Sequence, residues 1–460
     1  MERIVNAIYD IVWSPALVIL LVGAGFYFTI RTRCVQVRRF GLMARLLAGK
    51  ARPKEEGKPK GLSSFQTFCI ALSGRVGTGN IVGVATAIAL GGPGAVFWMW
   101  LIAFLGASTA FMESTLAQKY KFHHIHGWRG GPSCYIENGL GSRWLGILFA
   151  VFTIIGYGLL LAMVQSNSIA SAFDNSFSVS PLSTALAIAF VLGTIVIGGV
   201  RRIARVASVV TPFMAIAYVI MSIAIIAVNF RAVPGVFSAI FSSAFGADAT
   251  FGGIVGSAIS MGVKRGLFSN EAGEGGGAIV SASADVSYPA QQGLVQAFSV
   301  YIDTLLVCTA TALMILCTGK YNVFSPDGSA IVSNAPELGQ NYVAFTQSAI
   351  DTVFKGFGSG FVTIALAFFA FTTIMAYYFY AESSIIYIFK GNRRRELAAT
   401  WVYRFLLLGS IIYGACISSG VVWTIGDIGL GLTTWINIIA LLILCPQALK
   451  ALKDYESNLK

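Results

Sequence analysis

Long apolar segments separated by short polar ones repeat along almost the whole chain. About eleven of them are long enough to form helices that cross a bilayer core, which requires about 20 residues each. Their approximate bounds are 11–30, 65–90, 95–118, 144–173, 181–200, 206–230, 251–284, 291–317, 358–389, 397–417 and 421–449. The stretch 319–355 is too polar to cross, although 342–354 could form a short interfacial helix. The pattern predicts an all-α polytopic membrane protein.

Composition agrees with this pattern. The 460 residues are 56% hydrophobic and 11% charged, whereas a soluble domain carries about 25% charged residues. The net charge of +12 comes from basic residues between the apolar runs and not from a basic domain, so we expect contact with lipid and none with nucleic acid. Seven scattered cysteines give no disulfide framework and no metal-ligand spacing. The N-terminal segment lacks a basic leader and a small-residue cleavage site, so we expect its helix to be retained.

Lysine and arginine concentrate in alternate loops. If the first helix runs from outside to inside, most basic residues fall in cytoplasmic segments, namely 31–60, 119–143, 201–205, 390–395 and 450–460. The loops on the opposite side keep Arg3, Arg231, Lys320 and Lys355. The charge pattern therefore predicts an N-terminus outside and a C-terminus in the cytoplasm.

The apolar run 65–90 is interrupted near its centre by the segment 73–80, which reads Ser-Gly-Arg-Val-Gly-Thr-Gly-Asn. Each glycine destabilises a helix by roughly 1 kcal/mol relative to alanine, and Arg75 adds an insertion cost of about 2.5–3.5 kcal/mol. Irregular backbone at membrane depth is tolerated only where protein buries it or where it lines a watery cavity. We therefore expect a binding site made largely of free backbone amides and carbonyls.

A second interruption is expected in the run 251–284, which would open the second half of the chain if one helix precedes two sets of five. The segment 261–267 holds two glycines and the cations Lys264 and Arg265, and we expect the helix to break there. An odd number of helices in each half makes the halves antiparallel. The predicted parts are an extra N-terminal helix with a basic segment (1–60), two five-helix inverted repeats (61–230 and 231–449) and a cytoplasmic tail (450–460).

Several motifs resemble the alanine-or-glycine:cation symporter family. They lie at 73–88, 92–100, 130–132, 264–273 and 302–305, so the resemblance covers nearly the whole chain. It implies membership of the amino acid, polyamine and organocation superfamily with its leucine-transporter-like inverted repeat. It also implies that the protein is not an enzyme but a prokaryotic plasma-membrane symporter, which couples sodium to the uptake of a small neutral amino acid. Alanine and glycine are the first candidate substrates, and serine and glutamine are further candidates.

The chemistry of the first break agrees with this implication. A zwitterion needs N–H donors for its carboxylate, and the amides of Thr78 and Gly79 at the start of the outer half-helix suit that group. The resemblance implies that Gln165, Val263, Gly266, Thr373 and Tyr377 complete the substrate pocket. Sodium prefers oxygen ligands, and by resemblance these are the carbonyls of Ser73, Val76 and Phe369 with the hydroxyls of Thr372 and Thr373.

Charged residues inside the apolar runs need partners. We expect Glu271 or Glu274 to neutralise Arg75 or Arg265 as a gate or brace, and we include Asp303 among these structural charges. His123, His124 and His126 sit in a basic loop without cysteine or acidic neighbours, which argues against a metal centre.

The chain departs from the family pattern at two places. Relatives commonly continue the motif 269–273 with an apolar residue and a Gly-Ser-Ala-Pro-like run, whereas Glu274 and three glycines follow here. Some relatives carry tryptophan where Tyr377 stands. These departures affect the inner half-helix and the size of the pocket.

Three alternatives stay open from the sequence. They are proton coupling in place of sodium, an intramembrane enzyme with Glu271 or Asp303 as general base, and a channel. Paired central breaks in antiparallel halves favour a carrier over the last two. The preferred amino acid, the coupling ion and the oligomeric state also stay open.

The predicted orientation can be tested with single cysteines in a variant that lacks the native ones. Arg394→Cys should react with a membrane-impermeant maleimide from the cytoplasmic side only, because it lies in a basic cytoplasmic cluster. Lys355→Cys, in a predicted outer loop, is the control and should be labelled in intact cells. Labelling of position 394 in intact cells would overturn the orientation.

Overall fold

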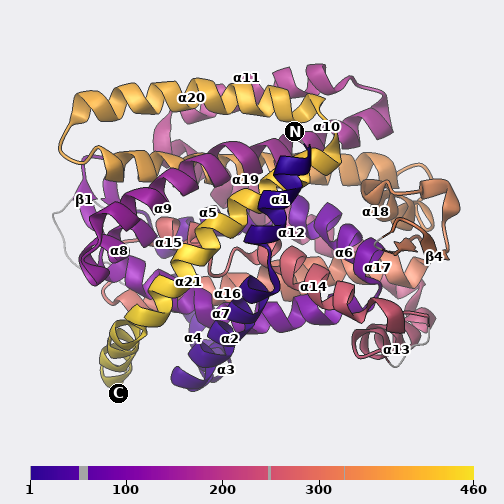
Figure 1. Ribbon diagram of the computed structural model, residues 1–460, viewed down its shortest axis with the longest axis horizontal. Coiled ribbons are helices and arrows are strands. Elements are labelled where there is room, and N and C mark those ends of the chain that lie inside the picture. Colours follow the sequence, from indigo (N-terminus) through magenta and orange to yellow (C-terminus); the bar gives the residue numbers. More distant parts are fainter. Residues whose placement is uncertain (1, 51–60, 247–249, 326, 460) are drawn as a thin grey trace.

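The computed structural model describes residues 2–50, 61–246, 250–325 and 327–459, and it is almost entirely helical (Figure 1). The first helices are α1 (Glu2–Val12), α2 (Pro15–Arg31), α3 (Val35–Arg38), α4 (Phe40–Arg45), α5 (Ser64–Arg75), α6 (Val84–Gly91), α7 (Gly94–Lys119), α8 (Pro132–Leu140), α9 (Arg143–Ile155), α10 (Ala162–Phe177) and α11 (Pro181–Val196). The others are α12 (Gly199–Val228), α13 (Val233–Ala244), α14 (Val255–Asn270), α15 (Gly276–Ser281), α16 (Pro289–Val300), α17 (Thr309–Thr318), α18 (Tyr342–Asp351), α19 (Gly358–Ile388), α20 (Arg393–Cys416) and α21 (Ser419–Ser457).

Several helices are flanked by short segments of wider or tighter helix. The wider, π-helical turns are Leu46–Lys50, Gly79–Gly83, Gly156–Leu161 and Tyr301–Cys308, and the tighter ones are Phe230–Ala232, Gly252–Ile254 and Pro336–Leu338. Two antiparallel hairpins complete the fold, β1 (Phe122–His124) with β2 (Gly127–Arg129) and β3 (Asn322–Phe324) with β4 (Ala330–Ser333).

Membrane-spanning character follows from length and apolar composition. Among the described residues, 8 helices meet both conditions, and the bent pair Ser64–Arg75 and Gly79–Gly91 brings the number to 9. Of the other predicted spans, α11 has 16 residues and the segment containing α14 is interrupted. The all-α membrane fold is confirmed, and the number eleven stays a prediction.

Some local expectations change. The first predicted span, 11–30, corresponds mainly to α2, and a further helix, α1, precedes it and ends at Val12. The basic segment after it contains α3, α4 and the turn to Lys50, whereas its remainder, 51–60, lies outside the described residues. The β1–β2 hairpin, α8 and α13 were not expected, and α18 forms where a short helix was predicted.

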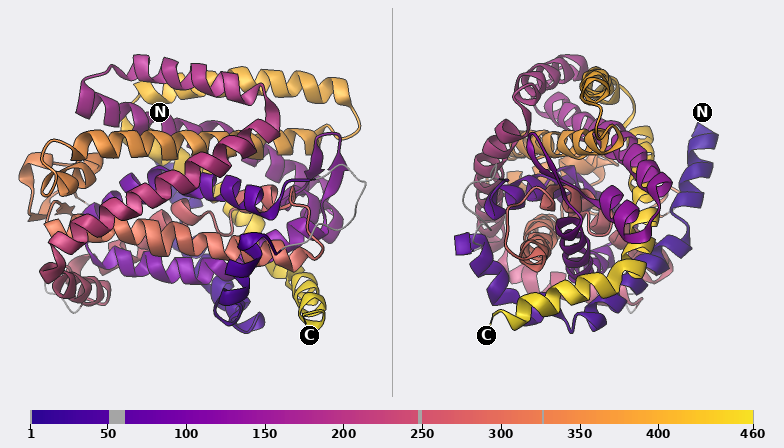
Figure 2. Two further views of the ribbon diagram at one scale, coloured as in Figure 1. Left: turned by 180° about the vertical axis from the view of Figure 1, so that it is seen from behind. Right: turned by 90° about the vertical axis from the view of Figure 1, so that its left-hand side faces the viewer.

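The loops fall into two groups at opposite ends of the molecule. Figure 1 shows α13, α18 and β4 at one end and β1 and α8 at the other. Helix α21 crosses obliquely over the outside of the bundle, and its C-terminal end lies toward β1 and α8 (Figures 1 and 2). This grouping matches the two sets of loops that the charge pattern assigns to opposite sides.

The two interrupted segments pack against each other in opposite directions. Near one end, Gly91 approaches the backbone of Ala258, and near the other, the Leu62 N–H donates to the Ser283 carbonyl at 3.0 Å. Residue numbers therefore rise along the first segment as they fall along the second. This is the relation expected of two inverted halves.

The second interruption lies further along the chain than the glycines predict. Helix α14 runs unbroken through 261–267, so the break expected there is wrong. The chain leaves the helix at Glu271, where φ is 52°, and Gly273 and Gly275 follow with φ of 98° and 94° before α15 begins. Positive φ favours glycine, so the break uses the glycines after Asn270.

The glycines of α14 serve helix packing instead. A Cβ added at Gly262 would lie 2.5 Å from the Cβ of Trp98, and one at Gly266 would lie 2.3 Å from the Cγ2 of Ile102. Both neighbours belong to α7. Small residues at these positions let the two helices approach closely, as membrane helices often do.

This packing makes a stability prediction. Gly262→Ala should lower the Tm of the detergent-solubilised protein, because the new Cβ would lie 2.6 Å from the Ala95 carbonyl oxygen and overpacking costs about 1–3 kcal/mol. Gly256→Ala is the matched control, since a Cβ at this position of α14 meets nothing within 4 Å. Equal Tm values for the two variants would show that the close approach is not needed.

Candidate substrate and cation site

The first break brings the backbone against α19. Helix α5 ends at Arg75, Val76 is extended with ψ of 90°, and the chain resumes at Gly79 with a bend of 48°. A Cβ at Gly77 would lie 2.5 Å from the Thr373 hydroxyl oxygen. Glycine is therefore required at position 77 for the break to sit this close to α19.

Side-chain carbonyls satisfy two amides of the break. The Thr78 N–H donates to Gln165 Oε1 at 3.1 Å, and the Gly77 N–H donates to Asn80 Oδ1 at 2.8 Å. The structure therefore brings together Thr78 and Gln165, both predicted to bind substrate. A substrate carboxylate can take the Thr78 amide only if the Gln165 side chain turns away.

The predicted sodium ligands converge on one hydroxyl group. Thr373 Oγ1 donates to the carbonyls of Ser73 at 2.8 Å and Phe369 at 2.9 Å, and the Val76 carbonyl lies 3.4 Å away. The neighbouring Thr372 hydroxyl donates to the same Phe369 carbonyl at 2.9 Å. All five predicted groups thus belong to one small cluster of oxygens.

The break explains why these oxygens are available. In a continuous helix the Gly77 N–H would bond to the Ser73 carbonyl, but here it donates to Asn80. The Ser73 carbonyl is then free to face Thr373. A cluster of uncharged oxygens with spare lone pairs fits a hard monovalent cation, whose ligands are oxygens.

The other residues predicted to line the substrate pocket contact side chains outside the first break. The buried Tyr377 ring contacts Tyr157 and Tyr380, with centroid distances of 5.2 and 5.8 Å. Val263 is buried in α14, and Gly266 lies where α14 packs on α7. Among the contacts recorded for the described residues, neither joins the cluster around Thr373.

Gly79 connects the first break to the second interrupted segment. A Cβ added to it would lie 3.1 Å from Phe268 and from the backbone of Ser269. The start of the outer half-helix therefore lies directly against the C-terminal end of α14.

Arg75 and Asp303 are both buried and satisfied mainly by neutral groups. Arg75 Nε donates to the Asn270 carbonyl at 2.7 Å and Nη1 donates to Gln296 Oε1 at 3.1 Å. Asp303 accepts from the Asn80 amide at 2.7 Å and the Ser269 hydroxyl at 2.8 Å. Arg75 and Asp303 therefore link the first break to the C-terminal end of α14, where the second break begins.

Arg265 pairs with a residue that sequence reasoning missed. Its guanidinium donates to the Asp427 carboxylate of α21, and not to Glu271 or Glu274 as expected. The Trp423 ring lies 4.9 Å from the Arg265 carbon Cζ and 4.9 Å from the Phe268 ring. One carboxylate inside the otherwise apolar run 421–449 was the available signal for Asp427.

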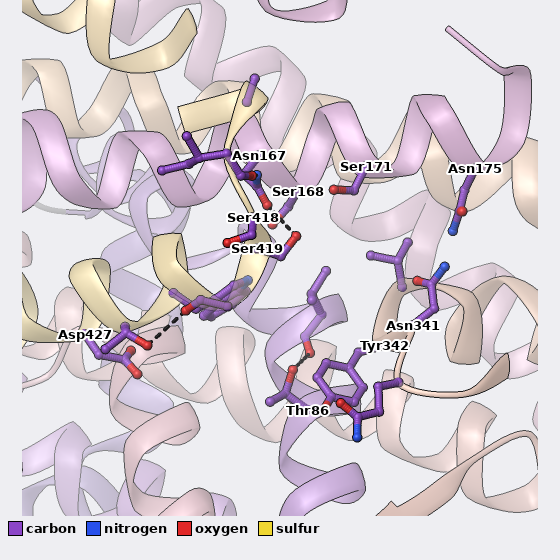
Figure 3. A pocket seen from close by; sticks show the side chains of 18 of the residues that line it. Thr86, Asn167, Ser168, Ser171, Asn175, Asn341, Tyr342, Ser418, Ser419 and Asp427 are labelled. Carbon is purple, nitrogen blue, oxygen red and sulfur yellow. Dashed lines mark hydrogen bonds between the residues drawn. The ribbon is translucent and has the colours of Figure 1, made fainter. Parts of the chain in front are cut away.

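This ion pair lies at the wall of a vestibule of about 830 Å³. Figure 3 shows Asn167, Ser168, Ser171, Ser418 and Ser419 around it, with Asn341 and Tyr342 of the α18 region facing them. Arg265, Trp423 and Asp427 also line it. Because Phe268 contacts both Trp423 and Gly79, these side chains separate the vestibule from the first break.

The histidines near the β1–β2 hairpin join a charged network. His124 lies 3.3 Å from Glu396 and His126 lies 3.2 Å from Arg393 of α20, and burial lowers the pKa of His124. Over the described part of the chain, no group of three or more His, Cys, Asp and Glu is arranged to hold a metal ion.

Comparison with known proteins finds one matching family and relatives whose names describe amino-acid carriers. A model of the sodium:alanine symporter family matches residues 1–460. The "Sodium/proton-dependent alanine carrier protein" of Bacillus sp. (strain PS3) is 49% identical over 87% of this chain and 89% of its own. The "Probable sodium/glutamine symporter GlnT" of Bacillus subtilis (strain 168) is 40% identical over 100% of this chain and 92% of its own.

The fold also resembles a solved transporter. The crystal structure of MhsT in complex with L-phenylalanine superposes with a TM-score of 0.56 at 13% identity, covering 83% of this chain and 89% of that one. This likeness shows the leucine-transporter-like fold. Because the family model matches the whole length and these relatives align over most of theirs, the chain belongs to the sodium:alanine symporter family.

Proposed function

We propose that this protein is a sodium-coupled symporter of small neutral amino acids that works by alternating access in a prokaryotic plasma membrane. The observation that carries the proposal is the convergence of the Ser73, Val76 and Phe369 carbonyls on the Thr373 hydroxyl. The family assignment makes the protein a transporter and rules out the intramembrane enzyme.

The cation site is electrically neutral. Its oxygens come from three carbonyls and two hydroxyls, so a bound sodium ion brings one uncompensated positive charge. A substrate carboxylate at the Thr78 amide would supply the opposite charge nearby. We infer that each ligand binds better when the other is present, which is the thermodynamic basis of coupling.

The substrate site lies between Gln165, the first break and the Tyr377 ring. Gln165 holds the Thr78 amide while no carboxylate does so, and Tyr377 limits the space beside α19. Alanine and glycine are the first candidates, because Gln165 and Tyr377 are both buried and the resemblance to the family favours these two amino acids. Glutamine stays a candidate, because the name of one relative includes it.

Substrate enters through the vestibule. The predicted orientation places its loops outside the cell, and the Arg265 and Asp427 pair with Trp423 and Phe268 stands between it and the first break. Opening this barrier and closing it again is one half of the alternating cycle.

Labelled alanine separates a carrier from a channel. Proteoliposomes loaded with unlabelled alanine should accumulate the labelled form above equilibrium when sodium is present, because a carrier exchanges one molecule for another. A channel would only equilibrate the label. The name of one relative pairs sodium with protons, so sodium and pH should be varied independently.

Removing one of the proposed sodium ligands should lower the affinity for sodium. Thr373→Val should raise the sodium concentration for half-maximal uptake about tenfold or more, because it removes one oxygen ligand. A loss of about 1.4 kcal/mol in binding free energy lowers the affinity tenfold. Thr372→Ala should act in the same direction. Sodium titration of labelled alanine uptake measures both.

Thr433→Val is the matched control for these variants. Its hydroxyl is also buried in a membrane helix, but it bonds to the Leu430 carbonyl of its own helix at 2.9 Å. This variant should keep the wild-type sodium dependence. If both Thr372→Ala and Thr373→Val also kept it, the sodium ligands would be wrongly assigned.

Enlarging the ring at position 377 should narrow the substrate range. Tyr377→Trp fills space beside Tyr157, so serine and glutamine should compete less well against labelled alanine, while glycine still competes. Competition uptake with these amino acids and aspartate is the measurement. Strong inhibition by aspartate, or an unchanged range in the variant, would place the pocket elsewhere.

A further inference from the structure

Four carboxylic acids lie buried around the second break. They are Glu113 of α7, Glu271 and Glu274 of the break itself, and Asp303, and the exposed fraction of each is 0%. Arg75 is the basic group that acts on all of them. If every acid were ionised, the cluster would hold an uncompensated negative charge, which is costly without water or counter-ions.

Arg75 does not remove this imbalance through ion pairs. Over the described residues it forms hydrogen bonds with Asn270, Gln296 and Ser299, and its Nη2 has no partner. The guanidinium therefore neutralises the acids only from a distance.

Two of the four acids have several donors to stabilise an ionised form. Asp303 accepts from Asn80, Ser269 and Thr304 at 2.7 to 2.8 Å. Glu113 accepts from the Gly273 N–H at 3.2 Å and the Asn437 amide at 3.1 Å. Hydrogen bonds of this kind favour the charged carboxylate.

Glu274 has the poorest surroundings for a negative charge. Its Oε2 accepts from the Tyr157 hydroxyl at 2.5 Å, and its buried Oε1, like those of Glu113 and Glu271, has no partner among the described residues. The strongest charge acting on Glu274 is the carboxylate of Glu271, while for Glu271 and Glu113 it is the Arg75 guanidinium.

A proton fits the single unpartnered oxygen at this position. The described residues contain no arrangement of three acidic, histidine or cysteine groups that could hold a metal. A proton needs one oxygen and no coordination shell. Binding it converts the unpartnered Oε1 into a neutral hydroxyl and removes one of the buried charges.

We propose that Glu274 is a proton-binding site, that it is protonated in the conformation described here, and that its proton travels with the amino acid. The inference rests on the proposed symport. The charged and titratable groups that face Glu274 are Glu271 beside it, Glu113 of α7, Arg75 of α5, Tyr157 of the turn after α9, and Tyr377 of α19.

The site is connected to the proposed substrate pocket. The Tyr157 hydroxyl bonds to Glu274, and the Tyr157 ring contacts Tyr377 at 5.2 Å. Gly273 and Gly275 flank Glu274 with positive φ, so this segment is built from residues that can change conformation at low cost. The proton is released when rearrangement of the break exposes Glu274 to water on the side opposite the vestibule.

The test follows protons and alanine in the same proteoliposomes. The lumen contains a pH-sensitive dye, the potential is clamped with potassium and valinomycin, and labelled alanine is added with sodium. Wild-type protein should acidify the lumen as alanine enters. Glu274→Gln should keep sodium-dependent uptake, while acidification falls to the level of empty liposomes. Glu456→Gln, which removes a surface carboxylate paired with Arg38 and Arg39, should behave like wild type.

The outcomes separate this inference from the proposed function. Absence of sodium-dependent uptake by the wild type would contradict the symport itself. Uptake without acidification, or acidification that persists in Glu274→Gln, would overturn the proton site alone.

A second variant and a spectrum cover the case in which Glu274→Gln does not fold. Glu274→Met also removes the carboxyl group and should show the same loss of acidification. In the infrared spectrum of the wild type at neutral pH, the carbonyl stretch of a protonated carboxyl group should be present. Its absence would overturn the proposal without any variant.

Discussion

The structure depends on one constraint, that backbone groups freed at membrane depth must find partners inside the protein. At the first break the chain leaves the helix for three residues, and several of the freed groups meet specific neighbours. Gln165 and Asn80 accept from the amides, and Thr373 meets the carbonyls. The residues that stabilise the break are therefore the same residues that we propose to bind the ligands.

The close contacts at the first break explain the arrangement of the surrounding helices. Thr373 lies on α19 and Gln165 on α10, and each must approach a backbone that has no side chain at Gly77. The two broken segments run antiparallel, so the end of α5 lies beside the end of α14. The antiparallel arrangement thus brings the free backbone groups of the first break close to those at the end of α14.

The sequence was sufficient for the fold class and the first break, because these depend on local signals: long apolar runs and the glycines that interrupt one of them. The ligand set of the first break was implied by the resemblance to the family and stays a prediction. It failed at the second break, because Gly262 and Gly266 look the same in sequence whether they unwind a helix or let it approach α7. It also missed Asp427, because the Arg265 partner lies 162 residues away and only tertiary packing brings them together. Local patterns predict where a helix is weak, and packing decides whether it breaks.

Arg75 and Arg265 illustrate different uses of charge. Arg265 meets a carboxylate at the wall of the vestibule, so its charge is paired directly. Arg75 is bonded to neutral groups, and its bond to the Asn270 carbonyl joins the last residue of α5 to the last residue of α14. A rearrangement at the first break that moves Arg75 must therefore move the start of the second break as well. This bond physically connects the ligand site that we propose at the first break to the segment that carries Glu271 and Glu274.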